Sequence, residues 1–271
     1  MIGVLTRTAM QAKRPFASRM RNVFMQQEYQ STESRPAAIL DDSYSFVEAS
    51  YRPHEISRQA VNLPFDLFRY RVIKRCVDIV LVVLFAPILL PIMLVVAALV
   101  RLRTPGPVFF SHRRIRRNGA FFAMWKFRTM CNNSAEVLED YLSSHPEARA
   151  EWRKNHKLRN DPRITGLGLF LRRYSLDELP QVWNVLTGRM SLVGPRPIVA
   201  AEVEKYGNRF GCYCKVKPGV TGLWQVSGRS DLTYDQRVAL DCKYVKEWSL
   251  FLDLKILIRT LASVVNQDGA C

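Results

Sequence analysis

Residues 79–100 read IVLVVLFAPILLPIMLVVAALV, an unbroken apolar run that decides the fold class of this chain. At about 1.5 Å per helical residue, a run of this length is sufficient to cross the hydrocarbon core of a bilayer. The run therefore predicts a membrane-associated helix. How that helix meets the membrane depends on the residues inside the run and on both of its flanks.

Pro87 and Pro91 lie four residues apart in the middle of the run, where each removes a helical hydrogen bond and bends the axis. The run is also basic on both sides, with Lys74 and Arg75 before it and Arg101 after it. Positive charge marks the cytoplasmic side of a membrane helix, so a single span is expected to carry it on one flank only. A helix that bends inside one leaflet and returns satisfies both observations better than a simple span does.

We therefore predict a proline-broken, re-entrant membrane helix over residues 67–104, with the simple transmembrane span as the alternative. Asp78 stands at its entrance, where a carboxylate is expected to avoid lipid and to pair with Lys74 or Arg75 near the interface. The residues that define this predicted membrane element are Asp78, Pro87 and Pro91.

The composition indicates an anionic partner. The chain has 271 residues and is 48% hydrophobic, and this length and composition suit one core domain plus a tail. Its formal net charge is +16. Nucleic acid, anionic lipid and a nucleotide substrate all fit this charge. A nucleic-acid-binding protein would leave the apolar run without a role, and its charge should concentrate on a recognition element instead of bracketing a membrane segment.

Residues 1–66 are predicted to form a separate N-terminal tail. They show little apolar periodicity and no apolar h-region of the kind that a secretory signal requires, and residues 1–27 contain basic side chains but no acid. A disordered basic tail and an interfacial segment attracted to anionic lipid both fit this composition. The six cysteines have no zinc-binding spacing, so we expect reduced thiols in a cytoplasmic domain.

A second stretch, residues 171–197, reads LRRYSLDELPQVWNVLTGRMSLVGPRP and contains the adjacent carboxylates Asp177 and Glu178. Apolar residues recur at helical spacing after Ser175, a residue type that caps helices. We therefore expect the carboxylates in the first turn of an amphipathic helix, where the helix dipole stabilises anions. Consecutive helical residues point roughly 100° apart, so the two carboxylates are expected to have different tasks.

Basic side chains accompany these carboxylates. Arg172 precedes them, Arg196 follows in VGPRP, and Gly194 in the same motif permits a close backbone approach. An acidic first turn by itself is common at the start of a surface helix. Guanidinium groups, however, bind phosphate through paired hydrogen bonds, so carboxylates beside several arginines suggest phosphoryl chemistry.

The segment after the membrane element predicts a β-hairpin. Short strands are expected at 108–110 and 121–127, joined by a basic turn at Asn118-Gly119, a dipeptide favoured in hairpins. Lys126 and Arg128 would project from the same side of the second strand, where they could bind substrate or form only a solvated face.

The remaining segments predict helices and one basic loop. Residues 136–157 read as a charged surface helix, and the glycines that follow, at 166 and 168, suggest close packing or phosphate contact. The loop KPGVTGLWQVSGR, residues 217–229, suggests backbone and basic groups that meet a phosphate or a base, although its glycine spacing alone is weak evidence. Residues 235–265 predict two helices, and the apolar stripe of the second fits a buried core and a membrane interface equally well.

Several long motifs together resemble the bacterial sugar transferase family. In chain order they are WKFRTM, RRYSLDELPQVWNVL, MSLVGPRP and KPGVTGLWQVSGR. The resemblance covers residues 71–266 and is closest to the monotopic polyprenyl-phosphate phosphoglycosyl transferases that initiate exopolysaccharide synthesis. It implies an α+β, mostly helical membrane protein with one re-entrant helix. Residues 105–271 would then form a small cytoplasmic catalytic domain with short strands and interfacial helices.

The resemblance also implies a two-step transfer at the bacterial inner membrane. Asp177 would attack the β-phosphate of a UDP-sugar, with UDP-glucose or UDP-galactose favoured, and would release UMP. Undecaprenyl phosphate would then take the sugar phosphate from the carboxylate. A carboxylate can act as a covalent nucleophile, and Mg²⁺ prefers carboxylate and phosphate oxygens.

The candidate site residues follow from these roles. The catalytic residues would be Asp177, Glu178 and Arg172, and the first two would also hold Mg²⁺. The expected substrate-binding residues are basic, and they are Lys126, Arg128, Arg196, Lys217 and Arg229.

Two positions depart from the family pattern, and two features stay open. Arg189 lies where members usually carry Asp, and Arg116 lies where Gly is usual. These departures put local turn geometry and substrate preference in question. A homodimer is expected by analogy alone. A catalytically silent membrane scaffold is the alternative function, but it would not explain the carboxylate–arginine cluster.

Overall fold

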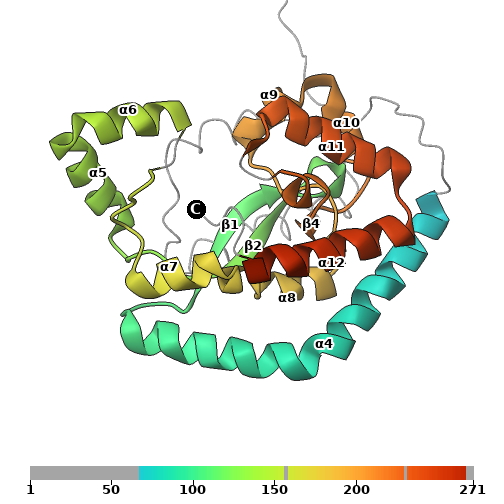
Figure 1. The fold of residues 1–271 in the computed structure, drawn as a ribbon, viewed down its shortest axis with the longest axis horizontal. Coiled ribbons are helices and arrows are strands. Elements are labelled where there is room, and N and C mark those ends of the chain that lie inside the picture. Colours follow the sequence, from blue (N-terminus) through green and yellow to red (C-terminus); the bar gives the residue numbers. More distant parts are fainter. Residues whose placement is uncertain (1–66, 156–157, 229–230, 267–271) are drawn as a thin grey trace, which may run out of the picture. The chain divides into compact units, whose positions relative to one another are not determined.

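The structure is a computed structural model, and it describes residues 67–155, 158–228 and 231–266. These residues belong to one compact unit, residues 41–271. The predicted N-terminal tail lies outside the described residues. The described part is mostly helical with a few short strands, as the sequence predicted (Figure 1).

The longest element is α4, Leu67–Arg103, with Pro87 and Pro91 inside it. Its segment Arg71–Arg103 is long and apolar enough to cross a membrane, by length and composition, and only 11% of its most apolar window is buried in the protein. The helix is continuous through both prolines and bends near its middle (Figure 1). The apolar helix was therefore predicted correctly, but the prolines bend it without interrupting it. Re-entry into one leaflet stays a prediction.

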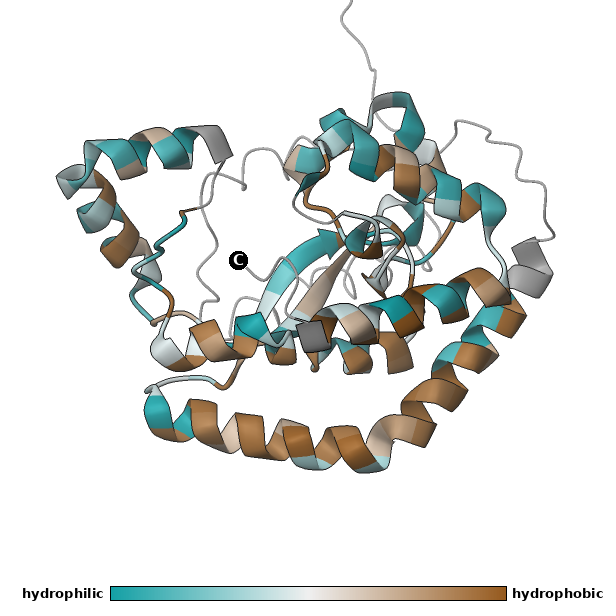
Figure 2. Ribbon diagram, in the orientation of Figure 1, coloured by the Kyte–Doolittle hydropathy of each residue, from teal (hydrophilic) through white to brown (hydrophobic). Residues whose placement is uncertain are grey.

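Both ends of α4 contact the rest of the protein. Near the N-terminal end, Lys74 Nζ lies 2.7 Å from Asp253 Oδ2. Near the C-terminal end, Val96 and Val100 are buried against Phe127 and its neighbours. The middle of the helix is mostly exposed and apolar (Figure 2).

A hairpin of β1, Phe109–Ile115, and β2, Phe121–Phe127, follows α4 and is antiparallel. Its turn contains Asn118 and Gly119, both with left-handed backbone, at φ 68° and 74°. The predicted Asn-Gly turn is therefore confirmed. The first strand is longer than predicted because its basic residues belong to the β-ladder, where 113 and 114 pair with 123 and 122.

The charged segment after the hairpin forms two helices instead of the predicted one. They are α5, Ser134–Ser144, and α6, Pro146–Asn155. Pro146 begins the second helix because a proline lacks the N–H that an interior helical position needs, whereas the first turn tolerates its absence.

The predicted helix over the carboxylate stretch is also wrong in detail. After α7, Gly166–Arg173, the chain forms a short 3₁₀ turn, η2, Leu176–Glu178, and only then α8, Gln181–Leu186. Ser175 does not cap a helix with its side chain, and its backbone is left-handed, at φ 54°. The carboxylates therefore lie in a sharp turn between two helices.

A second, parallel pair of strands consists of β3, Ser191–Val193, and β4, Gly219–Thr221. Short turns and helices connect them and fill the space beyond them. They are η3, Ala200–Glu202; α9, Val203–Tyr206; η4, Gly207–Arg209; α10, Phe210–Tyr213; and η5, Trp224–Val226.

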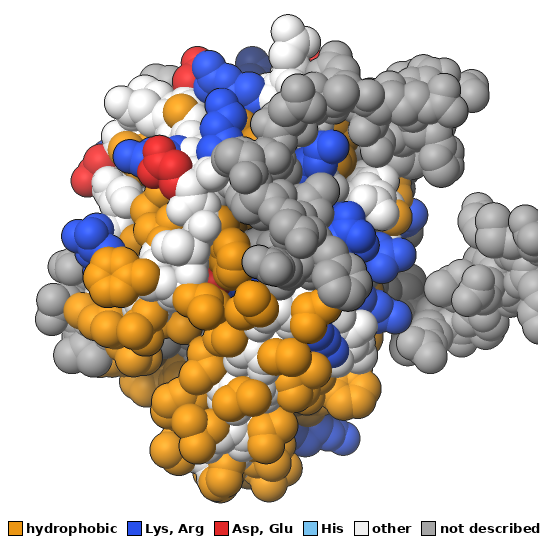
Figure 3. All heavy atoms as spheres, turned by 90° about the vertical axis from the view of Figure 1, so that its right-hand side faces the viewer, with side chains coloured by type: hydrophobic (Ala, Val, Ile, Leu, Met, Phe, Trp, Pro, Cys, Tyr) orange, Lys and Arg blue, Asp and Glu red, His pale blue; other side chains and the backbone are white. Residues whose placement is uncertain are grey.

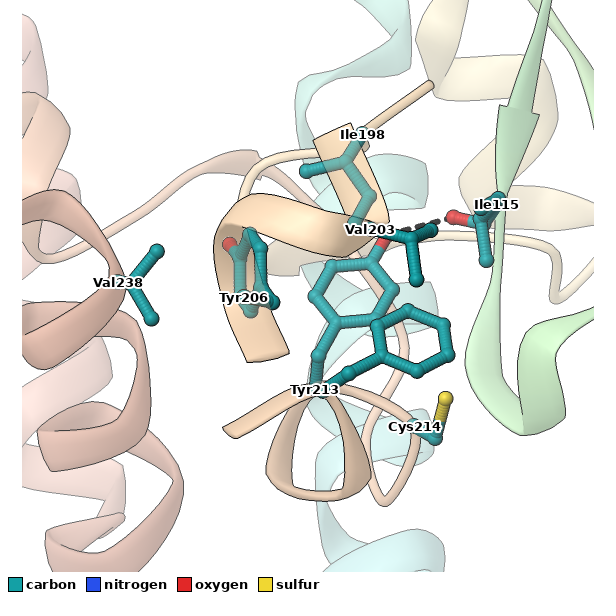
Figure 4. Close-up of a cluster of buried hydrophobic side chains, with 8 residues drawn as sticks. Ile115, Ile198, Val203, Tyr206, Tyr213, Cys214 and Val238 are labelled. Atoms are coloured by element: carbon teal, nitrogen blue, oxygen red, sulfur yellow. Dashed lines mark hydrogen bonds between the residues drawn. The ribbon is translucent and has the colours of Figure 1, made fainter. Parts of the chain in front are cut away.

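Two helices complete the described chain, as predicted. They are α11, Tyr234–Glu247, and α12, Leu250–Asn266. The main core cluster joins α11 to α9, α10 and the hairpin, and in it the Tyr213 hydroxyl donates to the Ile115 carbonyl (Figure 4). The face of α12 that contains Ile256 is buried in a second cluster. Its opposite face exposes Leu250, Phe251, Leu254, Ile258 and Leu261. The buried-core alternative is therefore confirmed for one face, and the membrane interface stays a prediction for the other.

The buried ion pair between α4 and α12 gives a stability prediction. Lys74 and Asp253 are only 4% and 3% exposed. Replacing Lys74 with Met leaves the Asp253 carboxylate buried without its cation, which should lower the free energy of unfolding by about 3–5 kcal/mol. Thermal and denaturant unfolding of the detergent-solubilised protein would measure this loss. The double variant Lys74→Met/Asp253→Asn should recover part of it, and equal losses in both variants would contradict a direct pairing.

A second prediction uses two glycines of α7. A Cβ at Gly168 would lie 2.0 Å from the Thr129 carbonyl oxygen, whereas a Cβ at Gly166 would meet nothing within 4 Å. Gly168→Ala should therefore destabilise the protein by about 1–3 kcal/mol through overpacking. Gly166→Ala is the matched control and should leave the melting temperature within a degree or so of the parent. Equal melting temperatures for the two variants would show that α7 does not pack on the 129 backbone as described.

Candidate active site

Lys126 lies between the two adjacent carboxylates of η2. Its ammonium is 2.7 Å from Glu178 Oε1 and 3.5 Å from Asp177 Oδ2. Lys126 is the second-last residue of β2, so the hairpin places a cation directly beside the turn that carries the acids. The sequence predicted different tasks for the two carboxylates, and the structure shows that both nevertheless contact the same ammonium.

A buried amide holds this turn against the hairpin. Asn184 of α8 is fully buried; its Oδ1 accepts from the Trp125 N–H at 3.0 Å, and its Nδ2 donates to the Ala123 carbonyl at 2.8 Å. These bonds fix α8, and with it η2, along the edge of β2. Asn184 was not among the predicted site residues, although an amide on the apolar stripe of a helix could have indicated a buried contact.

The pKa values of the two carboxylates shift in opposite directions. Burial raises the pKa of Asp177 above its usual value, and repulsion from Glu178 adds to this, against the opposing attraction of Lys126 and Arg172. Burial also acts to raise the pKa of Glu178, but Lys126 and then Arg196 outweigh it and the pKa falls. Only 6% of Asp177 is exposed, whereas a third of the Glu178 side chain is. The site thus contains one enclosed carboxylate and one more accessible carboxylate that stays ionised.

Two predicted arginines belong to the same site. Arg172, in the last turn of α7, donates from Nε to Thr129 Oγ1 at 2.9 Å and attracts the Asp177 carboxylate. The Arg196 guanidinium lies 5.7 Å from the centre of the Trp224 ring and lowers the pKa of Glu178. The same ring carries Arg237, at 4.9 Å, a residue that the sequence analysis did not single out.

Arg128 points elsewhere. Its guanidinium donates to Asn132 Oδ1 at 2.6 Å and to the Thr104 carbonyl at 2.8 Å, at the C-terminal end of α4. Arg128 lines a cavity of about 310 Å³, and the other lining residues are Thr104, Pro105, 130–133 and Thr165. A larger cavity, of about 500 Å³, is lined by residues of η4, α10 and α11 and contains none of the predicted site residues.

The other predicted residues lie apart from the carboxylates or outside the described chain. Lys217 lies beside Arg75 and Gly188, near the N-terminal part of α4. Asp78 is buried; it accepts hydrogen bonds from Ser191 and the residue after it, and Lys74 lies 3.9 Å away. Arg229 lies outside the described residues.

The close backbone approach expected at Gly194 is confirmed, and the approaching backbone is the protein's own. A Cβ at this position would lie 2.6 Å from the Lys217 carbonyl oxygen and 2.9 Å from the Gly219 N–H nitrogen. The missing side chain therefore makes room for the protein's own backbone, where β3 and β4 come together, and not for a phosphate.

The carboxylate pair suits a hard cation such as Mg²⁺. Both acids already converge on one positive group, and their oxygens are the donor type that Mg²⁺ prefers. Among the described residues no group of three or more His, Cys, Asp or Glu side chains could hold a metal ion. Mg²⁺ commonly binds through one or two carboxylates plus substrate phosphates and water, so a pair of acids is sufficient.

The chain is similar in sequence to several known proteins. The chain is 51% identical over 200 residues to the undecaprenyl-phosphate galactose phosphotransferase of Salmonella typhimurium. The matched region covers 74% of this chain and 42% of that protein. It is 40% identical to the UDP-glucose:undecaprenyl-phosphate glucose-1-phosphate transferase of Escherichia coli, over 70% of this chain and 40% of that one. The chain thus spans less than half the length of these relatives.

A shorter relative is matched over most of its length. The exopolysaccharide production protein ExoY of Rhizobium meliloti is 46% identical, over 73% of this chain and 87% of that protein. The model of one family, described as bacterial sugar transferase, matches residues 69–267. That range contains α4, the hairpin and the carboxylate turn with its arginines. The chain therefore belongs to the bacterial sugar transferase family.

Proposed function

We propose that the protein transfers a sugar 1-phosphate from a UDP-sugar to undecaprenyl phosphate and releases UMP. The reaction would be the first membrane step of exopolysaccharide synthesis. The observation that carries this proposal is the enclosed Asp177 carboxylate beside Lys126 and Arg172, on a domain attached to an apolar helix. The names of the relatives favour galactose or glucose as the sugar.

Asp177 is the proposed nucleophile. A carboxylate oxygen would attack the β-phosphorus, and the bond from that phosphorus to the oxygen bridging to the α-phosphate would break, so that UMP leaves with that oxygen. A phosphate oxygen of undecaprenyl phosphate would then attack the same phosphorus and break its bond to Asp177. The carboxylate is restored, and the product is a polyprenyl diphosphate sugar.

The neighbouring groups of the chain would manage charge during both steps. Lys126, Arg172 and Arg196 are fixed donors that can neutralise phosphate oxygens as they gain charge. Glu178 stays ionised beside them. When bound, Mg²⁺ would be held by Asp177 and Glu178 and would offset the negative charge of the diphosphate.

The two attachments of α4 support the proposed membrane placement. A helix that crossed the bilayer would put its ends on opposite sides, whereas both ends of α4 contact the same domain, through Lys74 and through Val96 and Val100. These contacts and the basic flanks support a re-entrant helix in the inner membrane with the domain on the cytoplasmic side. The exposed apolar face of α12 would lie on the same membrane surface.

This placement brings the acceptor to the site. The C-terminal end of α4 packs in one cluster with Phe127 and Leu171, which stand next to Arg128 and Arg172 in the chain. A polyprenyl chain lying along the exposed side of α4 could therefore present its phosphate near Asp177. A silent scaffold would need neither this proximity nor the enclosed carboxylate.

The decisive experiment is UMP release from UDP-glucose and UDP-galactose by purified protein with Mg²⁺ and undecaprenyl phosphate. Asp177→Asn removes the nucleophilic oxygen charge and should lower the rate at least about 1,000-fold. Asp235→Asn, at an exposed position of α11, is the matched control and should keep the parent rate. Without acceptor, the intact mass of the parent should increase by one hexose phosphate. A parent-like rate for the Asp177 variant would exclude the proposed nucleophile.

The environment of Asp177 gives a pH prediction. Because its pKa is raised, the reactive ionised form is lost at a higher pH than for an ordinary aspartate as the solution is acidified. The single-turnover rate should therefore rise with pH through an apparent pKa above the usual aspartate range. Lys126→Met removes the strongest attraction that favours the charged form, so the profile should move to higher pH as well as fall in amplitude. A lower rate with an unchanged profile would show that Lys126 does not set the charge of Asp177.

A further inference from the structure

Two cations, Arg75 and Lys217, border one small space beside the N-terminal part of α4. The Arg75 guanidinium donates hydrogen bonds to the carbonyls of Val185 and Leu186, the last residues of α8. Gly188 follows this helix, and a Cβ on it would lie 3.5 Å from Lys217 Nζ and 3.8 Å from Arg75 Cζ. Both charged groups therefore face the same point above a residue that has no side chain.

The charge around Lys217 is unbalanced. Burial lowers the pKa of the Lys217 ammonium, and repulsion from Arg75 lowers it further. Attraction to Asp78 acts in the opposite direction, and weaker repulsion from Arg117 and Lys74 adds to that from Arg75. Within the described ranges, neither Arg75 nor Lys217 forms a salt bridge. An anion in the space above Gly188 would remove this repulsion.

The nearest acids are already engaged. Asp78 accepts hydrogen bonds from Ser191 and from the next backbone N–H. Asp253 takes Lys74 at 2.7 Å and also accepts from Tyr244 at 2.8 Å. These carboxylates stabilise the attachment of α4, so they are not available to neutralise Arg75 and Lys217.

The position of the space along α4 indicates which anion it would meet. Arg75 stands between exposed apolar residues, Val72 and Ile73 before it and Ile79 and Val80 after it. With the membrane placement proposed above, this turn lies where the chain enters the bilayer, at the level of the lipid phosphates. On the face shown in Figure 3, lysine and arginine side chains border the hydrophobic surface.

We propose that Arg75 and Lys217 bind the phosphate of an anionic phospholipid headgroup in the space above Gly188. Two of the five N–H donors of the Arg75 guanidinium bind the α8 carbonyls, and the remaining donors, together with the compact charge of the Lys217 ammonium, suit phosphate oxygens. The left-handed backbone of Gly188, at φ 73°, would strain any other residue and keeps this space open. The bound lipid would fix the entrance of α4 at the membrane surface. This inference uses the membrane placement proposed above but not the transfer chemistry.

The test compares binding and stability without measuring activity. Full-length protein in a neutral, phosphate-free detergent is titrated separately with phosphatidylglycerol, inorganic phosphate and uncharged diacylglycerol. The melting temperature is measured at each concentration, and native mass spectrometry measures the bound lipid. Phosphatidylglycerol should raise the melting temperature of the parent. Lys217→Met should weaken its binding at least about tenfold. Because Lys217 has no acid partner to lose among the described residues, the variant without lipid should melt at or above the parent temperature.

Controls make each result decisive. Lys243→Met removes an exposed lysine of α11 and should bind lipid like the parent. Parent-like lipid binding by the Lys217 variant would overturn the proposal. Equal, Lys217-dependent saturation by inorganic phosphate at the same concentration would overturn the lipid assignment and make this a site for soluble phosphate. A separate test mixes the parent protein with phospholipid vesicles. If the parent does not enter them, the membrane placement of α4 is contradicted, and this result is distinguishable from failure of the Arg75–Lys217 site.

Discussion

The structure depends on buried charged contacts that hold an apolar helix to a polar domain. In lipid, one apolar surface gains nothing by contact with another, so α4 needs specific polar contacts and close packing to adopt one orientation. Lys74 with Asp253, and Asp78 with the β3 backbone, supply such contacts at one end. Tight packing of Val100 supplies the attachment at the other. Since the second attachment lies beside the hairpin and α7, the same contacts fix how α4 lies relative to the carboxylates.

Short elements under local constraint build the site itself. The left-handed backbone at Ser175 turns the chain between α7 and η2, and such a conformation persists in a non-glycine residue only where its surroundings enforce it. Asn184 ties α8 to the hairpin from the other side. Asp177 is thus held between two fixed elements, as the proposed nucleophilic role would require.

The strong positive charge is distributed in groups with separate positions. Lys126, Arg172 and Arg196 surround the carboxylates. Arg75 and Lys217 lie at the beginning of the apolar part of α4. Arg128 lies at the end of that helix, where burial and then repulsion from Arg101 lower the pKa of the Arg128 guanidinium. Under the proposed function each group would meet a phosphate, which would account for the positive charge of the composition.

The sequence by itself determined the elements whose signal is local. The apolar run, the Asn-Gly turn, the two C-terminal helices and the carboxylate–arginine cluster were all readable, because periodicity and turn chemistry depend on neighbouring residues. Only the tertiary structure decided that η2 is a 3₁₀ turn, that Lys126 joins both acids and that Lys217 lies with Arg75 instead. These outcomes depend on backbone approach and on burial between segments far apart in the chain, such as Asn184 against β2, and no local pattern encodes them.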